Sequence, residues 1–325
     1  MLSSLAAQLR QSLSLLQKQD IQTASQALGR EAADPTILLG DDCAAIPDAE
    51  GYLLLAAEGM LPQFLETEPW FAGWSAVMVN VSDIYAMGGR PIAVVDTLWS
   101  QSTQSTDLIW QGMKAAAQTY QVPIVGGHTN CHSPYNALSV SILGRAKQLI
   151  TSFNAQPGDR LLVATDFRGK PHARYPFWDA ATTADPIQLR ENLALLPHLA
   201  ETGLCDAGKD ISMGGIIGTL LMLLETSGCG AVLHLDQIPC PPTLPLDRWL
   251  MSFPSYGFLL SVRPENVSIV QSYFREQHLV CEVVGEVQPT RQCVLRSGQE
   301  SVVFWDLAQQ QLTGFGNREW EMGNG

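Results

Sequence analysis

Short apolar segments alternate with longer, helix-length segments through the first half of this sequence, and that alternation constrains the fold most. The segments of strand length are 52–57, 92–99, 122–127 and 137–146, and those of helix length are 71–87 and 105–120. The segment 71–87 is followed by Gly88-Gly89 and Pro91, residues that commonly end a helix. Strands that alternate with helices predict an α/β arrangement in this half of the chain.

The second half continues the mixed pattern and suggests a second domain. A turn and a new strand within 154–166 place a domain boundary near residue 150. A polar loop covers 167–186, helices are predicted near 187–201 and 213–227, strands at 230–235, 256–262 and 280–287, and a final hairpin at 293–305. Because 325 residues exceed one ordinary core, we expect domains at 36–150 and 151–325, preceded by a helical extension over 1–35.

Composition excludes several classes of function. Lysine and arginine total 19 against 32 acidic residues, and the net charge of −13 argues against a nucleic-acid partner. The seven cysteines form no C-x-x-C pair, so neither a disulfide framework nor a structural zinc site is expected. Residues 1–19 have the pattern of an amphipathic helix rather than a signal peptide, and no apolar segment is long enough for a membrane span. We therefore expect a cytoplasmic protein without a membrane partner.

Carboxylates recur at the ends of the predicted apolar segments. Asp41 and Asp42 follow Gly40, Glu58 follows a predicted strand, Asn80 and Asp83 share one helix face, and Asp210 precedes a predicted helix. Oxygen ligands of this kind suit Mg²⁺, which also binds phosphate oxygens. The glycine pairs Gly126-Gly127 and Gly214-Gly215 could let backbone N–H groups approach a phosphate.

Each of these residues also has an ordinary structural interpretation. Asp41 and Asp42 could form a turn or cap a helix, and Asp83 could be a solvated helix residue. Glycine pairs usually mark turns, and His128 is more often a hydrogen-bonded structural residue than a ligand. The residue types alone leave both interpretations open.

The order of the motifs is more specific than any single motif. The chain carries, in order, GDDCAAI, NVSDIYAMGGRPIAV, VGGHT, PGDRLLVATD and DAGKDISMGGIIGTLLMLLETSG. Over about residues 36–290, this series resembles the AIR synthase-like ATP-binding superfamily, which includes aminoimidazole ribonucleotide synthetase, selenophosphate synthetase, thiamine-monophosphate kinase and HypE. The resemblance implies a two-domain α/β (α+β) fold. Its N-terminal strands would pair across a homodimer barrel, beside a C-terminal α/β domain.

The same resemblance implies a site for ATP and Mg²⁺. By motif, the metal ligands would be Asp41, Asp42, Asp83 and Asp210, with Glu58 at a position where the family usually has aspartate. The residues lining the nucleotide would be Gly40, Asn80 and the predicted turn Gly126-Gly127-His128. His128 is a candidate catalytic residue only through its proximity to that turn.

Departures from the known members leave the acceptor unassigned. Selenophosphate synthetase carries a cysteine or selenocysteine in its N-terminal segment, but no cysteine precedes Cys43 in this chain. Thiamine-monophosphate kinase carries S-D-G in its second domain, where this chain has Ser212-Met213-Gly214. The C-terminus, EMGNG, lacks the reactive cysteine of HypE. A basic loop with Arg168, Lys170 and Arg174 could clamp a phosphate or carboxylate of the acceptor, or could be a solvated inter-domain loop.

Three functional hypotheses follow from these features. The first is an ATP- and Mg²⁺-dependent enzyme that activates a small molecule by phosphoryl transfer. The second is thiamine-monophosphate kinase or selenophosphate synthetase-like activity. The third, from another class, is a non-catalytic nucleotide-binding partner protein that kept the fold and the acids.

Overall fold

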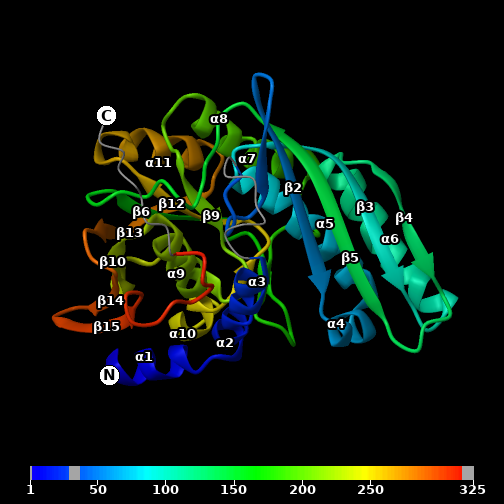
Figure 1. Ribbon diagram of the computed structural model, residues 1–325, viewed down its shortest axis with the longest axis horizontal. Coiled ribbons are helices and arrows are strands. Elements are labelled where there is room, and N and C mark those ends of the chain that lie inside the picture. Colours follow the sequence, from blue (N-terminus) through cyan, green and yellow to red (C-terminus); the bar gives the residue numbers. More distant parts are fainter. Residues whose placement is uncertain (1, 29–36, 317–325) are drawn as a thin grey trace. The chain divides into compact units, whose positions relative to one another are not determined.

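The computed structural model describes residues 2–28 and 37–316, which form two compact units (Figure 1). Unit 1 contains the described residues of 1–41 together with 150–178 and 203–316, and unit 2 contains 42–149 and 179–202. The N-terminal helices belong with the later part of the chain, and 179–202 belongs with the earlier part.

Unit 2 is built on a five-stranded sheet in the order β1-β2-β5-β3-β4. Its strands are β1 (Ala44–Asp48), β2 (Gly51–Met60), β3 (Arg90–Trp99), β4 (Ile124–Asn130) and β5 (Ala137–Ala146). Its helices are α4 (Pro62–Thr67), α5 (Pro69–Ala86), α6 (Thr103–Tyr120), α7 (Pro186–Leu193) and α8 (Leu195–Glu201). Strands β3 and β4 are parallel, and the other neighbouring pairs are antiparallel.

Helix α5 is almost entirely buried because it lies between the sheet and α6. The α5–α6 contact needs two glycines: a Cβ on Gly73 would lie 2.1 Å from the carbonyl oxygen of Ile109, and one on Gly112 would lie 1.9 Å from that of Trp70. The helix ends at the predicted glycines in a Schellman motif, in which Gly89 N–H donates to the Ile84 carbonyl.

The two faces of this sheet differ in cover. One face is packed under α5 and carries buried residues such as Leu54, Val94 and Ile142. The opposite face carries exposed apolar residues, with Leu55 at 47%, Val95 at 42% and Leu143 at 36% exposure. The strand registers place these three in neighbouring rows, since Leu143 pairs with Leu55 and with Ala93, two residues from Val95.

Unit 1 contains a seven-stranded sheet in the order β15-β14-β10-β13-β6-β12-β9. The strands are β6 (Arg160–Thr165), β9 (Ala207–Asp210), β10 (Gly230–His234), β12 (Gly257–Val262), β13 (Val280–Gln288), β14 (Gln292–Ser297) and β15 (Glu300–Asp306). Helix α9 (Gly215–Ser227) packs on β9, β10 and β12, and α11 (Val267–Glu276) packs on β13. The remaining elements are α10 (Leu246–Leu250), the 3-10 helices Leu235–Gln237 and Pro264–Asn266, and a small sheet of β11 (Phe253–Pro254), β8 (Phe177–Asp179) and β7 (Lys170–Pro171).

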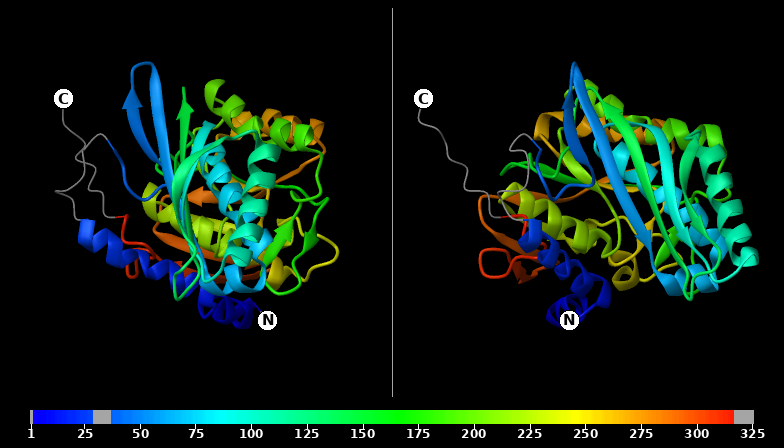
Figure 2. Two further views of the ribbon diagram at one scale, coloured as in Figure 1. Left: turned by 90° about the vertical axis from the view of Figure 1, so that its right-hand side faces the viewer. Right: turned by 45° about the vertical axis from the view of Figure 1, so that its right-hand side comes forward.

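Three short N-terminal helices dock on unit 1: α1 (Leu2–Arg10), α2 (Leu13–Gln19) and α3 (Ile21–Leu28). The Arg10 guanidinium donates to the carbonyls of Val303 at 2.6 Å and Phe304 at 2.7 Å, and it stacks over the Phe304 ring. Figure 2 shows these helices in blue, with α1 against the C-terminal hairpin. The helix predicted over residues 1–19 is therefore divided into α1 and α2, and α3 follows it.

The last described segment is anchored by a buried carboxylate of α9. Glu225 accepts hydrogen bonds from the N–H groups of Leu312, Thr313 and Gly314 and from the Thr313 hydroxyl, at 2.7–3.1 Å. These four donors satisfy an acid that would otherwise be costly to bury. They hold the segment so that Phe315 covers Gly40, whose φ of +105° suits glycine.

Most of the predicted helices and strands are confirmed, but the predicted helix 187–201 is divided into α7 and α8, and the predicted loop 167–186 contains strands β7 and β8. Two further differences affect the site. Strand β2 continues to Met60, so Glu58 lies within the strand rather than after it. Strand β4 runs through Gly126, Gly127 and His128, so the predicted turn at these residues is wrong. In the part of the chain that the structure describes, no helix is both long and apolar enough to cross a membrane.

Candidate metal and nucleotide site

Asp83 and Asn80 lie on the buried face of α5, one helical step apart. The Asn80 amide donates to the carbonyl of Ala76 at 2.8 Å, a bond to its own helix that orients the side chain. Asp83 is buried in a helix that is otherwise largely apolar. A solvated position for Asp83, the alternative that the sequence left open, is therefore wrong.

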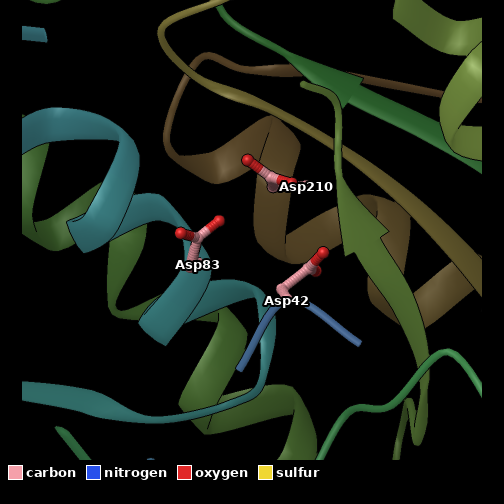
Figure 3. A group of neighbouring side chains, drawn as sticks. All are labelled: Asp42, Asp83 and Asp210. Atoms are coloured by element: carbon pink, nitrogen blue, oxygen red, sulfur yellow. The ribbon is translucent and has the colours of Figure 1, made fainter. Parts of the chain in front are cut away.

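Asp42 lies close to Asp83 although the two are far apart in the sequence. An oxygen of the half-buried Asp42 carboxylate is within 4.8 Å of a carboxylate oxygen of Asp83, and Figure 3 shows both side chains. Two carboxylates this close repel one another, most strongly where water is partly excluded. A hard divalent cation removes the repulsion and prefers oxygen ligands. This pair therefore fits Mg²⁺ by its chemistry.

Asp41, next to Asp42 in the sequence, has a different environment within unit 1. Its Oδ1 lies 3.3 Å from Lys209 Nζ, and its Oδ2 accepts the Ser152 N–H at 2.7 Å. The side chains of Asp41 and Lys209 are only 1% and 3% exposed. The two adjacent acids therefore have different partners: Asp41 forms a buried ion pair with Lys209, whereas the carboxylate of Asp42 lies near that of Asp83.

Asp210 is the last residue of β9 in unit 1, and Figure 3 also labels it. It is buried, it pairs with Phe258 of β12, and its carbonyl accepts the Thr219 hydroxyl at 3.3 Å. The loop after it passes through Gly214 and Gly215, both with positive φ, into α9. Asp210 therefore ends a strand that the sequence did not predict, and it precedes helix α9 as the sequence predicted.

The strand registers place Glu58 and His128, two of the predicted site residues, on opposite faces of the five-stranded sheet. Glu58, Val140, Asp96 and Gly127 form one cross-strand row, so they share one face of the sheet. Glu58 in this row is exposed. His128 is on the opposite face, where its ring lies 5.7 Å from that of Trp99. The structure thus places His128 on the other side of the sheet from Glu58.

Asp96 is a candidate functional residue that the sequence interpretation missed. It is 3% exposed, and neither carboxylate oxygen has a hydrogen-bond partner among the described residues. Gly127 makes room for it, since a Cβ there would lie 2.2 Å from Asp96 Oδ1. The available signal was that Asp96 is the one charged residue in the predicted strand 92–99.

Burial raises the pKa of the Asp96 carboxyl, which leads to a pH-dependent prediction. At low pH the Asp96 carboxyl is protonated in both the folded and the unfolded protein, so it does not change the free energy of unfolding. As the pH rises from 3.8, the pKa in the unfolded chain, through the higher pKa in the folded protein, ionisation favours the unfolded chain and the folded protein loses stability. Asp96→Asn should therefore raise the melting temperature more at about pH 7 than at about pH 4. Asp107→Asn, on the exposed surface of α6, is the matched control. Equal effects of Asp96→Asn at both pH values would contradict the prediction.

The basic loop is more ordered than the sequence suggested. The Arg168 guanidinium binds Asp166 through two hydrogen bonds, at 2.7 and 2.8 Å, which raises the pKa of Arg168 further. Lys170 and Arg174 are exposed. Lys170 and Pro171 form strand β7 of the small sheet, and after Arg174 the rings of Tyr175 and Phe177 stack at 5.4 Å. A role for this loop in acceptor binding stays a prediction.

Both domains of the AIR synthase related protein family match this chain. The N-terminal domain matches residues 40–146, and the C-terminal domain matches residues 156–297. The chain therefore belongs to the AIR synthase related protein family, as its motif order predicted.

Relatives agree with this assignment. An uncharacterized protein of Synechocystis sp. is 60% identical over 318 residues, covering 97% of this chain and 99% of the relative. A thiamine-monophosphate kinase of Rhodopirellula baltica is 27% identical over 213 residues, covering 62% of this chain and 64% of the kinase. In fold, the chain is similar to T. maritima PurL complexed with ATP, with a TM-score of 0.68 and 21% identity over 85% of this chain and 46% of PurL.

Proposed function

We propose that this protein is an ATP- and Mg²⁺-dependent enzyme that activates a small molecule by phosphoryl transfer. The observation that carries the proposal is the close, partly buried pair of carboxylates, Asp42 and Asp83. Such a pair is expected where a metal ion neutralises it. Membership of the family, a kinase among the relatives and a PurL structure with ATP support nucleotide use.

In this proposal, Asp42, Asp83 and Asp210, the acids that the motif order assigns to the metal, would hold Mg²⁺ against the triphosphate. The metal would neutralise charge that develops on the phosphoryl oxygens. The protein residues would supply positioning, which with charge neutralisation accounts for most of the rate in phosphoryl transfer. Asp41 is left out of this ligand set because Lys209 and the Ser152 N–H already bind both of its oxygens.

Titration of ATP with and without Mg²⁺ tests the proposed ligands. Asp83→Asn and Asp210→Asn keep the size of the side chain and remove its charge, so each should weaken Mg²⁺-dependent ATP binding by about tenfold or more, or about 1.4 kcal/mol. Asp107→Asn, an exposed position on α6, should bind as the wild type does. Melting curves confirm that each variant is folded. Wild-type affinity in both Asp83→Asn and Asp210→Asn would refute the metal assignment.

The acceptor is the second unknown, and thiamine monophosphate is the first compound to test. The relative from Rhodopirellula baltica is named a thiamine-monophosphate kinase, although Met213 departs from that family's motif. Product analysis after incubation with ATP and a panel of small molecules would identify a phosphorylated acceptor. ATP binding without turnover on any compound would favour the non-catalytic alternative.

We further propose that the protein is a homodimer. Its copies would pair through the face of the five-stranded sheet opposite α5, which we call the open face. Exposed apolar side chains at Leu55, Val95 and Leu143 lie on that face in neighbouring rows. A contiguous apolar patch on a sheet face usually marks an interface. The resemblance to the superfamily, whose N-terminal strands pair across a dimer, favours a second copy of this chain as the partner.

A further inference from the structure

Helix α2 is held firmly on unit 1 and faces the start of α9. Leu15 is buried, and a Cβ on Gly218 of α9 would lie 3.8 Å from Leu15 Cδ1. On either side of α2, Arg10 binds β15, and the Gln22 amide donates to the carbonyls of Gln311 and Leu312. These contacts fix the position of α2, so the side chains on its inner face have defined neighbours.

Lys18 is the cationic residue that α2 brings to this part of unit 1. Its ammonium is 3.4 Å from the Ser212 hydroxyl oxygen, and a Cβ on Gly214 would lie 3.9 Å from Lys18 Cε. Ser212 and Gly214 belong to the loop that directly follows Asp210. The half-buried lysine thus lies along the backbone of the loop that links Asp210 to α9.

We propose that Lys18 binds the phosphate chain of the nucleotide, so that the N-terminal helices form part of the binding site. The inference rests on the proposed function. A lysine ammonium binds phosphate as a compact point charge, and a chain with a net charge of −13 needs local cations to attract a triphosphate. Lys18 lies outside residues 40–146 and 156–297, the segments that match the family, so this contact would be added by the extension.

Nucleotide binding in the presence of Mg²⁺ tests the role of Lys18. Lys18→Met keeps an unbranched side chain, one heavy atom shorter than lysine, and removes its charge. This variant should weaken ATP binding about tenfold or more, while AMP binding changes less than about twofold, because the lost interaction is with the outer phosphates. Lys18→Arg, which keeps the charge, should recover most of the affinity for ATP. Lys114→Met, at an exposed position on α6, is the matched control.

The outcomes separate this inference from the proposed function. If Lys18→Met binds ATP as the wild type does while Asp83→Asn does not, the function stands and the inference is wrong. If Lys18→Met lowers ATP and AMP affinity equally and lowers the melting temperature, Lys18 only holds α2 in place, and the inference is again wrong. If the wild type binds no ATP, the proposed function fails and the inference fails with it.

Discussion

Lys209→Met should lower the free energy of unfolding by about 3–5 kcal/mol, a large effect for one substitution. The ammonium of Lys209 and the carboxylate of Asp41 are both almost fully buried, and they lie 3.3 Å apart. Removing the ammonium leaves the carboxylate of Asp41 without its cation in an environment that excludes water. Breaking a buried pair from one side is far more costly than replacing both partners, because the remaining charge is left uncompensated.

A double-mutant cycle measures this interaction directly. The cycle compares Lys209→Met, Asp41→Asn and the double variant by chemical denaturation. The double variant should lose less stability than the sum of the two single changes, since neither uncompensated charge remains. Lys114→Met on the surface of α6 should change the free energy of unfolding by less than about 0.5 kcal/mol. Additive losses in the cycle would show that Asp41 and Lys209 do not depend on each other, and would return Asp41 to the candidate metal ligands.

Local sequence signals predicted most of the secondary structure. The helix at 71–87 could be predicted because both of its signals, a long apolar segment and the glycines that follow it, are local in the sequence. Those glycines form the Schellman motif that ends α5. The sequence could not show that Asp41 pairs with Lys209, because 168 positions separate the two residues. Adjacent acids look equivalent in a sequence, and only tertiary contacts give them different partners.

Glycine gave the most misleading signal. Gly126-Gly127 looks like a turn, yet both residues lie in β4, paired in parallel with Val95 and Asp96 of β3. At Gly127 the missing Cβ is used for space beside Asp96, not for an unusual backbone angle. Whether a glycine serves a turn or a close approach depends on its neighbour across the sheet. The pairing of β4 with β3 also decides on which face of the sheet His128 lies, because successive residues of a strand point to opposite faces.

Val95→Asp should convert the protein from a dimer to a monomer. The Val95 side chain is 42% exposed on the open sheet face, so the aspartate stays in contact with water in the isolated unit and should not unfold it. In a symmetric dimer each copy would bury the new charge against the same patch of its partner, where an unpaired carboxylate is strongly unfavourable.

Light scattering at micromolar concentration would report the change as a mass that falls from twice 35.4 kDa to 35.4 kDa. Leu108→Asp is the control, because Leu108 is similarly exposed, at 38%, but lies on α6 instead of the open sheet face. A wild type of 35.4 kDa would refute the homodimer itself. A Val95→Asp variant that stays dimeric would instead place the interface elsewhere. In that case the apolar rows of β2, β3 and β5 would need a different partner, since an exposed patch of this kind has no stabilising role in a monomer.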